Sequence, residues 1–509
     1  MKLKTIIFFA PIPLVIFAYY ILINYFFSPD VAYLLHASSQ ILAGGKYGAD
    51  IFETNPPMIL YLYSPAVLLK KLTTINVITS VKLYVTLLAV ISLVTCFFLL
   101  KKLIKQQDKA LRYCLFCTLV FCLLFLPAFS FAQREHILII FMLPYLLSAA
   151  LALENKSIHP MMAIFIGTMA GLGFALKPFF LVTPCLVELY FIVKGRRLFA
   201  WVRIETMVIL SILILYLGSI FLFQPGYIHT VLPLVLRYYF SEIALTWNDI
   251  ILFTDVLFGA AMVLGYLFYC KYDHYCSLGW VLALALLGMI IAYLVPQTPW
   301  YYHVMPSFAL ALLLVAHLAG QAITTTKQSY FIDKSFIICL LGIVFVLTLP
   351  AVRYVKVLKL YSKSQSQWPA SAIAAYLNTQ SGPRSIACFG LGTTDCFPLV
   401  YYAQSSYAER FPSFWWYQRL RFLETSKQPK EVMVQVEKDK KYFIDSFAED
   451  LNRYKTRWVV IDLHHFQQLE NAQFNVIQYF SANEKFRDVW RHYRYLTTIK
   501  SITIYERSA

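Results

Sequence analysis

Charged residues are scarce in this chain of 509 residues, and apolar residues dominate it. Asp, Glu, Lys and Arg make up 14% of the sequence, whereas 59% is hydrophobic and the mean hydropathy is +0.62. Runs of roughly 20 apolar residues, enough to cross a hydrocarbon core about 30 Å thick, recur from residue 5 to residue 350. This composition argues against a soluble protein and predicts a polytopic α-helical membrane protein.

Metal-binding cysteine motifs and nucleotide-phosphate loops are both missing from the sequence. The ten cysteines show no metal-ligand spacing, and most lie in apolar runs, where a cysteine behaves as a small hydrophobe. Only Cys388 and Cys396 are candidates for a disulfide. The net charge of +17 raises the question of nucleic-acid binding, but the positions of the cations follow membrane topology instead. We therefore predict no nucleic-acid partner.

Eleven apolar segments are predicted to span the membrane, starting from a cytoplasmic N-terminus. The connections on the cytoplasmic side then hold most of the Lys and Arg residues found between spans, in agreement with the positive-inside rule. The first segment is too long for the apolar part of a signal peptide, so we expect a retained signal-anchor. The predicted spans lie near residues 5–27, 81–100, 111–127, 136–153, 159–176, 178–193, 204–223, 250–270, 277–295, 303–322 and 332–350.

A more polar tail begins after residue 350. Helices are expected in "WPASAIAAYLNTQ" and over residues 430–454, and strands in "RSIACFG", "RWVVIDL" and "SITIYER". We predict a transmembrane domain over residues 1–350 and a small α/β domain over residues 351–509. An odd number of spans places this second domain on the periplasmic side. Its cations alternate with acids, which favours a solvated surface and leaves attraction to anionic lipid or glycan phosphate as the alternative.

The first outer loop, predicted over residues 28–80, combines acids with an amphipathic pattern. Asp30 stands near the start of "SPDVAYLLHASSQIL", so it can serve as a helix cap. An acid at a membrane exit is also partly desolvated and well placed to act as a general base. The later run "PPMILYLYSPAVLLKKL" is short for a span and contains Pro65, so we expect a helix lying in the outer membrane interface.

Three further polar segments fall on the predicted outer side: "QREH" at residues 133–136, the pair Lys177-Pro178, and "PQTPWYYHVMP" before the tenth span. Each has a structural interpretation. Arg134 and Lys177 can extend to the membrane surface as snorkelling anchors. The aromatic residues Trp300, Tyr301 and Tyr302 can form an interfacial belt, and His303 can be a hydrogen-bonded packing residue. Taken together, these segments predict a cavity with an acid, several cations and aromatic walls. A lipid-linked phosphate donor and a hydroxylated acceptor require such a site.

The first loop resembles that of GT-C fold glycosyltransferases, in particular the bacterial relatives of protein O-mannosyltransferases and of the aminoarabinose transferase that modifies lipid A. Those enzymes carry an acid after the first span, an amphipathic helix, a "G-x-x-Y-x-D" type segment and a "PP-L" motif. The counterparts here are Asp30, residues 31–43, residues 44–50 and residues 56–58. "FAQREH", "GLGFALKP" and "WYYHVMP" are similar to three further motifs of the family, and the trailing domain fits as well. Val31 departs from the pattern, because the better-known members carry a second acid there. The acceptor-binding determinants of the protein mannosyltransferases also have no recognisable counterpart.

The resemblance implies an enzyme of the bacterial inner membrane that moves a sugar from a polyprenyl-phosphate donor to an acceptor hydroxyl on the periplasmic face. The acceptor is a glycan, lipid A or a protein. We expect a single displacement with inversion, in which Asp30 removes the acceptor proton. The mechanism requires no cofactor and leaves a divalent metal optional. Arg134 and Lys177 are the candidates for the donor phosphate, and the other substrate-binding candidates are Asp50, Glu53, Glu135, Tyr302 and His303.

A transporter or flippase of lipid-linked saccharides is the alternative function. Transport pathways need ionisable groups at membrane depth, and the main candidates within the spans are Glu188 and Asp255, both near a span end. The polar residues gather at one face of the membrane instead of running through it. A transporter also has little use for the domain over residues 351–509, so the sequence favours the enzyme.

Overall fold

The computed structural model describes residues 27–239, 254–298, 300–326, 355 and 369–508. The contacts within the chain divide it into two compact units. The first unit comprises Met1–Tyr25, Thr79–Gly218 and Ala244–Ser362, and the second comprises Phe26–Ile78, Ser219–Ile243 and Lys363–Ala509. Helix α10 runs from the first unit into the second.

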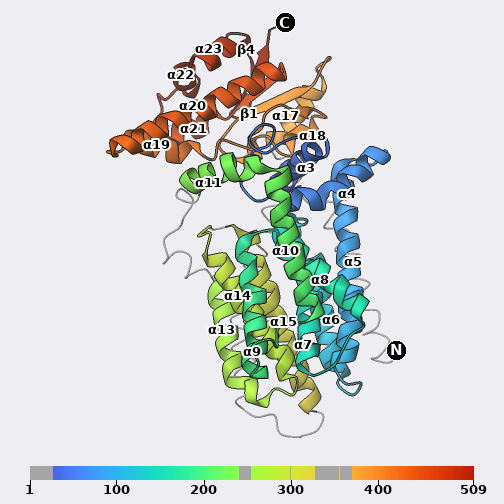
Figure 1. Ribbon diagram of the computed structural model, residues 1–509. Coiled ribbons are helices and arrows are strands. Elements are labelled where there is room, and N and C mark those ends of the chain that lie inside the picture. The colour runs from blue at the N-terminus through green and yellow to red at the C-terminus, as the bar shows by residue number, and fades with distance from the viewer. Residues whose placement is uncertain (1–26, 240–253, 299, 327–354, 356–368, 509) are drawn as a thin grey trace. The chain divides into compact units, whose positions relative to one another are not determined.

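The first unit is a bundle of apolar helices that lie side by side (Figure 1). Three short helices complete it at the ends of longer ones: η1 (Ala128–Ser130), η2 (Pro178–Leu181) and η4 (Cys270–Tyr272). The helices of the bundle are α5 (Val77–Leu103), α6 (Lys109–Leu124), α7 (Arg134–Leu153), α8 (Pro160–Phe174), α9 (Val182–Gly195), α10 (Ile204–Phe223), α13 (Thr254–Tyr269), α14 (Cys276–Leu294) and α15 (Tyr301–Thr326).

Helix α7 is the best buried helix of the bundle. All its residues from 134 to 151 are buried, and it packs against α8, α14 and α15. Other helices of the bundle therefore surround α7 along most of its length. Helix α8 approaches α10 through Gly167 and Gly171, where an added Cβ would lie 2.8 Å from the Glu205 carbonyl oxygen and 3.0 Å from the Ile212 side chain. This small-x-x-x-small spacing lets the two backbones come close.

The predicted spans between residues 81 and 322 coincide with helices α5 to α10 and α13 to α15. Within the described part of the chain, 6 helices are long and apolar enough to cross a membrane. Helices α6, α8 and α13 are shorter, with 16, 15 and 16 residues. The chain therefore has the fold of a multi-pass helical membrane protein, as its composition predicts. The first and last predicted spans fall outside the described residues, apart from Phe27.

The second unit contains a five-stranded sheet with the strand order β2-β1-β3-β5-β4. Strands β1 (Ser385–Phe389), β2 (Ser406–Tyr407) and β3 (Trp458–Ile461) are parallel, and β5 (Ile502–Arg507) is antiparallel to β3 and to β4 (Tyr493–Ile499). The helices around the sheet are α17 (Pro369–Asn378), η6 (Thr393–Asp395), α18 (Leu399–Tyr402), α19 (Tyr417–Thr425), α20 (Lys430–Arg453), α21 (Leu463–Leu469), α22 (Val476–Ser481) and α23 (Glu484–Trp490).

The sequence predicts three strands and two helices of this α/β domain and misses β2, β4 and the shorter helices. Strands β1, β3 and β5 and helices α17 and α20 lie where they are expected. Strands β1 and β3 read as continuous apolar runs because nearly all of their residues are buried, as in parallel sheets covered on both faces. Helix α20 places Val436, Phe443, Phe447 and Leu451 on one buried face at intervals of seven, four and four residues.

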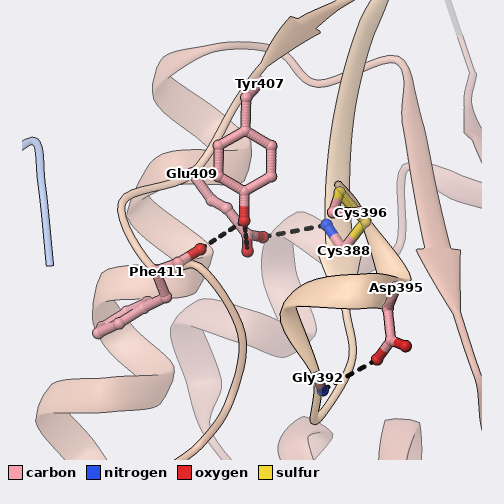
Figure 2. Close-up of a disulfide and its surroundings, with 7 residues drawn as sticks. All are labelled: Cys388, Gly392, Asp395, Cys396, Tyr407, Glu409 and Phe411. Carbon is pink, nitrogen blue, oxygen red and sulfur yellow. Dashed lines mark hydrogen bonds between the residues drawn. A yellow bond between two sulfur atoms is a disulfide. The ribbon is translucent and has the colours of Figure 1, made fainter. Parts of the chain in front are cut away.

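Cys388 and Cys396 form a disulfide, which confirms the sequence-based candidate (Figure 2). Cys388 lies on β1, and Cys396 directly follows η6. The neighbouring Glu409 carboxylate accepts a hydrogen bond from the Cys388 backbone N–H at 3.2 Å and is also bonded to the Tyr407 hydroxyl. Burial raises the pKa of Glu409 well above its usual range. The disulfide therefore ties the end of β1 to the loop that follows it.

The first loop folds together with the sheet domain in the second unit. It contains α3 (Pro29–Leu42) and α4 (Met58–Leu72), and the segment after α10 adds η3 (Tyr227–Val231) and α11 (Leu232–Tyr238). Helix α3 packs on α4, where the Ser38 hydroxyl donates to the Leu60 carbonyl at 2.7 Å. Helix α4 is the run expected in the membrane interface, and it has 15 residues with Pro65 inside. The predicted domain boundary at residue 350 lies outside the described residues and stays a prediction.

Candidate active site

Three of the predicted polar segments meet at one end of the helix bundle. Each supplies a residue at or just before the start of a helix: Glu135 in the first turn of α7, Lys177 directly before η2, and His303 in the first turn of α15. Helix starts carry partial positive charge from their unpaired N–H groups. The segments come together because α7 packs against both α8 and α15.

Lys177 is the centre of this group. Its ammonium group lies 2.6 Å from Glu135 Oε1 and 3.1 Å from His303 Nε2. His303 Nε2 is also 3.6 Å from the same carboxylate oxygen. Since the ammonium can only donate, Nε2 accepts from it, and His303 Nδ1 then donates to the Thr298 hydroxyl. We call Glu135, Lys177 and His303 the Lys177 cluster.

The Lys177 cluster is shielded from solvent. The side chains of Lys177, Glu135 and His303 are 4%, 1% and 8% exposed. A buried ion pair of this kind does not fit the alternative in which Lys177 extends as a snorkelling anchor. Three aromatic rings surround the ammonium group, with centroids 5.5 to 5.8 Å away, and they belong to Phe179, Phe180 and Tyr302. The Tyr302 ring also packs edge-on against His303 at 4.5 Å.

Arg134 and His136 flank Glu135 on α7 and differ in their surroundings. Arg134 is buried and opens the helix. His136 is fully buried. Its Nδ1 accepts a hydrogen bond from the Ala132 N–H at 3.0 Å, and its Nε2 lies 2.8 Å from the Leu123 carbonyl oxygen. His136 thus braces the start of α7, whereas Arg134 adds a second cation beside Glu135.

Cations and acids are both present at this end of the bundle. Arg134 and Lys177 are positive, whereas Glu135 and Asp255, which is buried near the start of α13, are negative. Among the described residues, Glu135 Oε2 is a buried oxygen with no hydrogen-bond partner. Buried polar atoms in native proteins are nearly always hydrogen-bonded, so this oxygen can still accept from a donor such as a hydroxyl group. Lys177, Arg134 and the start of α7 are the groups here that are chemically suited to an anionic ligand.

Asp30 belongs to the second unit and lies at the second residue of α3. The N-cap position is occupied by Ser28, with Pro29 as the first helical residue, so Asp30 is not the N-cap itself. Its carboxylate is partly exposed and stands in the first turn, where the helix dipole favours a negative charge. The role of Asp30 as a base stays a prediction.

Asp50 and Glu53 also lie in the second unit, and both are engaged in hydrogen bonds. Burial alone would raise the pKa of Asp50, but hydrogen bonds from the Lys46 N–H at 2.9 Å and the Arg453 guanidinium at 2.8 Å lower it. Glu53 is 5% exposed, and its Oε1 accepts from the backbone N–H and the side-chain amide of Asn55 at 3.0 and 2.7 Å. Glu53 thereby shapes the turn that leads into the two prolines.

Glu53 also acts on buried tyrosines of the second unit. Burial and the Glu53 charge together raise the pKa of Tyr33, which lies on α3. The same two causes raise the pKa of Tyr227. The substrate-binding roles expected for Asp50 and Glu53 stay predictions, and the structure shows what holds each carboxylate in place.

Sequence reasoning missed several residues that shape these regions. Thr298 fixes the orientation of His303, and its place in "PQTPWYYH", five residues before the histidine, is the signal that could have identified it. Arg410 lies in the tail but touches the first loop through its backbone and side chain, and no local pattern marks it. The described residues contain no group of three or more His, Cys, Asp or Glu side chains that could hold a metal ion.

Comparison with known proteins relates the chain to solved structures. No protein-family model and no curated protein sequence matches it. ArnT from Cupriavidus metallidurans, in the apo state, matches with a TM-score of 0.54 at 12% identity, over 99% of this chain and 97% of ArnT. The oligosaccharyltransferase AglB from Archaeoglobus fulgidus, in complex with an inhibitory peptide and a dolichol-phosphate, gives a TM-score of 0.44 at 11% identity, over 93% of this chain and 69% of AglB.

The match to AglB lies below a TM-score of 0.5 and carries no weight for the fold, so the assignment depends on ArnT. ArnT is a GT-C fold glycosyltransferase, and its match extends over nearly the whole of both chains. The resemblance to GT-C enzymes expected from the first loop is thus confirmed at the level of the fold. The chain has the GT-C fold of multi-pass membrane glycosyltransferases, together with a small C-terminal α/β domain.

Proposed function

We propose that this protein is an inverting membrane glycosyltransferase. It transfers a sugar from a polyprenyl-phosphate donor to a hydroxyl of a glycan, a lipid or a protein on the periplasmic face of the bacterial inner membrane. The observation that carries the proposal is the buried Lys177 cluster, with Arg134 beside it, at one end of a GT-C bundle. The GT-C fold makes glycosyl transfer the expected class of reaction, and Lys177 and Arg134 are the cations proposed to bind the donor phosphate.

The charge of the donor changes during transfer in a way that this region can stabilise. A sugar linked to a polyprenyl phosphate is a phosphodiester with one negative charge. When the bond between the anomeric carbon and the phosphate oxygen breaks, the departing polyprenyl phosphate gains a second negative charge. Lys177, Arg134 and the start of α7 are positive groups that favour this product more than the substrate. Glu135 holds the Lys177 ammonium in place through the ion pair at 2.6 Å.

Asp30 is the proposed general base. The acceptor hydroxyl oxygen forms a bond to the anomeric carbon as the bond to the phosphate breaks, and Asp30 takes the hydroxyl proton. One displacement inverts the configuration at that carbon. No cofactor enters this scheme, and a divalent metal remains optional. Tyr302 and His303 are proposed to hydrogen-bond the sugar or the phosphate, and Asp50 and Glu53 to shape the loop that carries Asp30.

The disulfide supports the periplasmic placement of the C-terminal domain. Structural disulfides persist in oxidising compartments such as the bacterial periplasm and are rare in the cytosol. Cys388 and Cys396 are bonded within this domain. With a cytoplasmic N-terminus and an odd number of spans, the same side follows from the distribution of Lys and Arg.

Transport of a lipid-linked saccharide has less support. Glu188, one of the two acids that a transporter could use, is bound in a structural network. Its Oε1 lies 2.5 Å from the Arg203 guanidinium, 2.7 Å from the Tyr145 hydroxyl and 3.0 Å from the Thr206 hydroxyl. Three partners on one oxygen fix the position of the Glu188 carboxylate, although its Oε2 has no hydrogen-bond partner among the described residues. Asp255, the other acid, is buried near the start of α13.

Mass analysis of envelope glycolipids and glycoproteins, with and without the gene, tests the proposed function. We expect one glycan, lipid or protein species to lose a sugar when the gene is absent. Re-expression of Asp30→Asn should fail to restore it, with transfer lowered by about 100-fold or more, the usual scale of general-base catalysis. The matched control is Asp488→Asn, which removes an exposed acid of α23 and should restore the modification fully. Full restoration by Asp30→Asn would exclude Asp30 as the base.

A further inference from the structure

The sheet domain grips one short segment of the first loop, residues 48–52, at three points. The Tyr442 hydroxyl donates to the Gly48 carbonyl oxygen at 3.1 Å. The Arg453 guanidinium binds the Asp50 carboxylate at 2.8 Å. The Phe52 backbone N–H donates to the carbonyl oxygen of Arg410 at 2.9 Å. All of these residues belong to the second unit, although more than 350 positions of sequence separate the partners in each contact.

Two of these contacts come from one face of α20. Tyr442 and Arg453 are eleven residues apart, about three helical turns, so their side chains project in nearly the same direction. The Gly48 backbone has φ +80, a left-handed conformation that turns its carbonyl group within a tight bend. The face of α20 thus runs along the bend of residues 48–50.

The third contact is fixed to α20 by a buried ion pair. The Arg410 guanidinium binds Asp450 of α20 at 2.8 Å, and the Arg410 N–H donates to the same carboxylate at 2.8 Å. The Arg410 carbonyl oxygen is therefore held in position when it accepts from Phe52. The Tyr33 hydroxyl of α3 donates to the same oxygen at 3.4 Å. Tyr33 lies one helical turn after Asp30, so a single carbonyl group of the sheet domain contacts both the bend and the helix that carries the proposed base.

Ring packing strengthens the same junction. The Phe52 side chain is fully buried and packs against Phe411 at 4.9 Å, Trp415 at 5.9 Å and Phe443 at 6.4 Å. Phe443 directly follows Tyr442 on α20. Burial of the Phe52 ring contributes most of the free energy that stabilises this junction, and the three polar contacts fix the direction in which the backbone runs.

We propose that Arg410, Tyr442 and Arg453 form a clamp that positions the first loop for sugar transfer. These are positioning residues: they act through the bend of residues 48–52 and through α3, and they do not touch the substrates. The inference rests on the proposed function, because it assigns the sheet domain a task in the same reaction. It also gives Asp50 a specific role, since its charge is engaged by Arg453 of the sheet domain.

The test uses variants that keep the fold of the full-length protein. Arg410 is avoided, because its removal would leave Asp450 buried without a cation. The double variant Tyr442→Phe, Arg453→Gln keeps the ring and the helix and removes two polar contacts. Arg453→Lys keeps the charge and is the conservative rescue. Lys441→Gln is the matched control: it breaks an ion pair on the same helix, between Lys441 and Asp445 at 2.8 Å, away from the loop.

Hydrogen exchange read by mass spectrometry, on purified protein in detergent, measures the clamp directly. In the double variant we expect peptides over residues 44–56 to exchange about tenfold faster, from the combined loss of one hydrogen bond and one exposed ion pair. Lys441→Gln and Arg453→Lys should exchange like the wild type. Unchanged exchange in the double variant would overturn the clamp, whether or not the protein transfers sugar.

Kinetics with a polyprenyl-phosphate sugar then measure positioning. We expect the double variant to lower kcat about tenfold and to change the KM for the donor less than twofold, because the loop is misplaced while the Lys177 cluster is intact. Of the two single variants, Arg453→Lys should retain most of the wild-type kcat, and Arg453→Gln should not. Faster exchange with an unchanged kcat would overturn the positioning role. If the wild type transfers no sugar, the proposed function fails, and the exchange experiment still decides whether the clamp exists.

Discussion

Helix α15 carries two buried histidines, one in its first turn and one in its second half, and the sites around them are built differently. His303 belongs to the Lys177 cluster, with its Nε2 3.6 Å from Glu135. His317 lies fourteen residues later, roughly 21 Å along the helix, and its Nε2 is 2.9 Å from Asp273. We call Asp273, His317 and Gln321 the Asp273 cluster. Each site thus pairs a histidine with a buried carboxylate on the same helical framework.

The Asp273 carboxylate is saturated with hydrogen bonds, and the Glu135 carboxylate is not. Asp273 Oδ2 accepts from the Tyr266 hydroxyl at 2.8 Å and from His317, and Oδ1 accepts from the Gln321 amide and the Tyr275 N–H at 2.5 and 2.8 Å. Glu135 uses Oε1 for Lys177, while Oε2 has no hydrogen-bond partner within the described ranges. Four hydrogen bonds fix the Asp273 carboxylate in place, although His317 Nδ1 has no partner among the described residues. Glu135 Oε2 can still accept a hydrogen bond from a ligand.

The largest effect expected from this comparison is on stability. Asp273→Ala removes the acceptor shared by Tyr266, His317 and Gln321, and breaking a buried pair typically costs about 3–5 kcal/mol. We therefore expect the variant to unfold at clearly lower temperature in detergent, while kcat per folded molecule stays unchanged. The control is Asp488→Ala, which removes an exposed acid. A normal unfolding temperature combined with lost kcat would place Asp273 in the reaction and end the distinction between the two clusters.

The next effect is on donor binding at the Lys177 cluster. The double variant Lys177→Ala, Glu135→Gln removes the cation without leaving an unpaired buried carboxylate. A charged hydrogen bond contributes about 1.5–3 kcal/mol, so we expect the KM for the polyprenyl-phosphate donor to rise by roughly 10- to 150-fold. The KM for the acceptor should change little.

The matched control for this variant is Lys194→Ala. Lys194 donates to the Ser277 hydroxyl at 3.0 Å in the same bundle, but it lies near the end of α9, away from the cluster. Donor titrations on both proteins decide the question. An unchanged donor KM in the Lys177 variant would return the cluster to a structural role like that of the Asp273 cluster.

The amino-acid sequence predicts the bundle well because lipid leaves few choices to the backbone. Each apolar run must satisfy its own hydrogen bonds, so length and hydropathy suffice to place α7 or α14. The short elements of the sheet domain, such as β2 with two residues, leave no such periodic signal. Strand β4 was also missed, because its exposed and partly exposed residues give no apolar run.

The candidate site also has features that the sequence predicts and features that it does not. Topology brings Glu135, Lys177 and His303 to one end of the bundle, because each lies at the start of a helix on the same predicted side. The contacts of Arg410 with Gly48 and Phe52 could not be predicted, since they join segments more than 350 residues apart through a loop with no fixed period. The hydrogen bonds that Asp273 accepts depend on side-chain geometry, and the sequence pattern around "KYDHYC" does not predict them.

The smallest effect expected is that of Arg134→Lys, and it separates a phosphate ligand from a charged anchor. If Arg134 only supplies positive charge at the start of α7, lysine replaces it with little loss. If it binds the donor phosphate as a planar fork, a single ammonium group does not place its donors in the same way. We expect the donor KM to rise several-fold, with the acceptor KM and the unfolding temperature unchanged. The control is Arg197→Lys, at an exposed position between α9 and α10. Because Arg134 is buried next to Glu135 and Lys177, a donor KM equal to that of the wild type would mean that Lys177 alone carries the phosphate and that Arg134 serves the bundle, as the Asp273 cluster does.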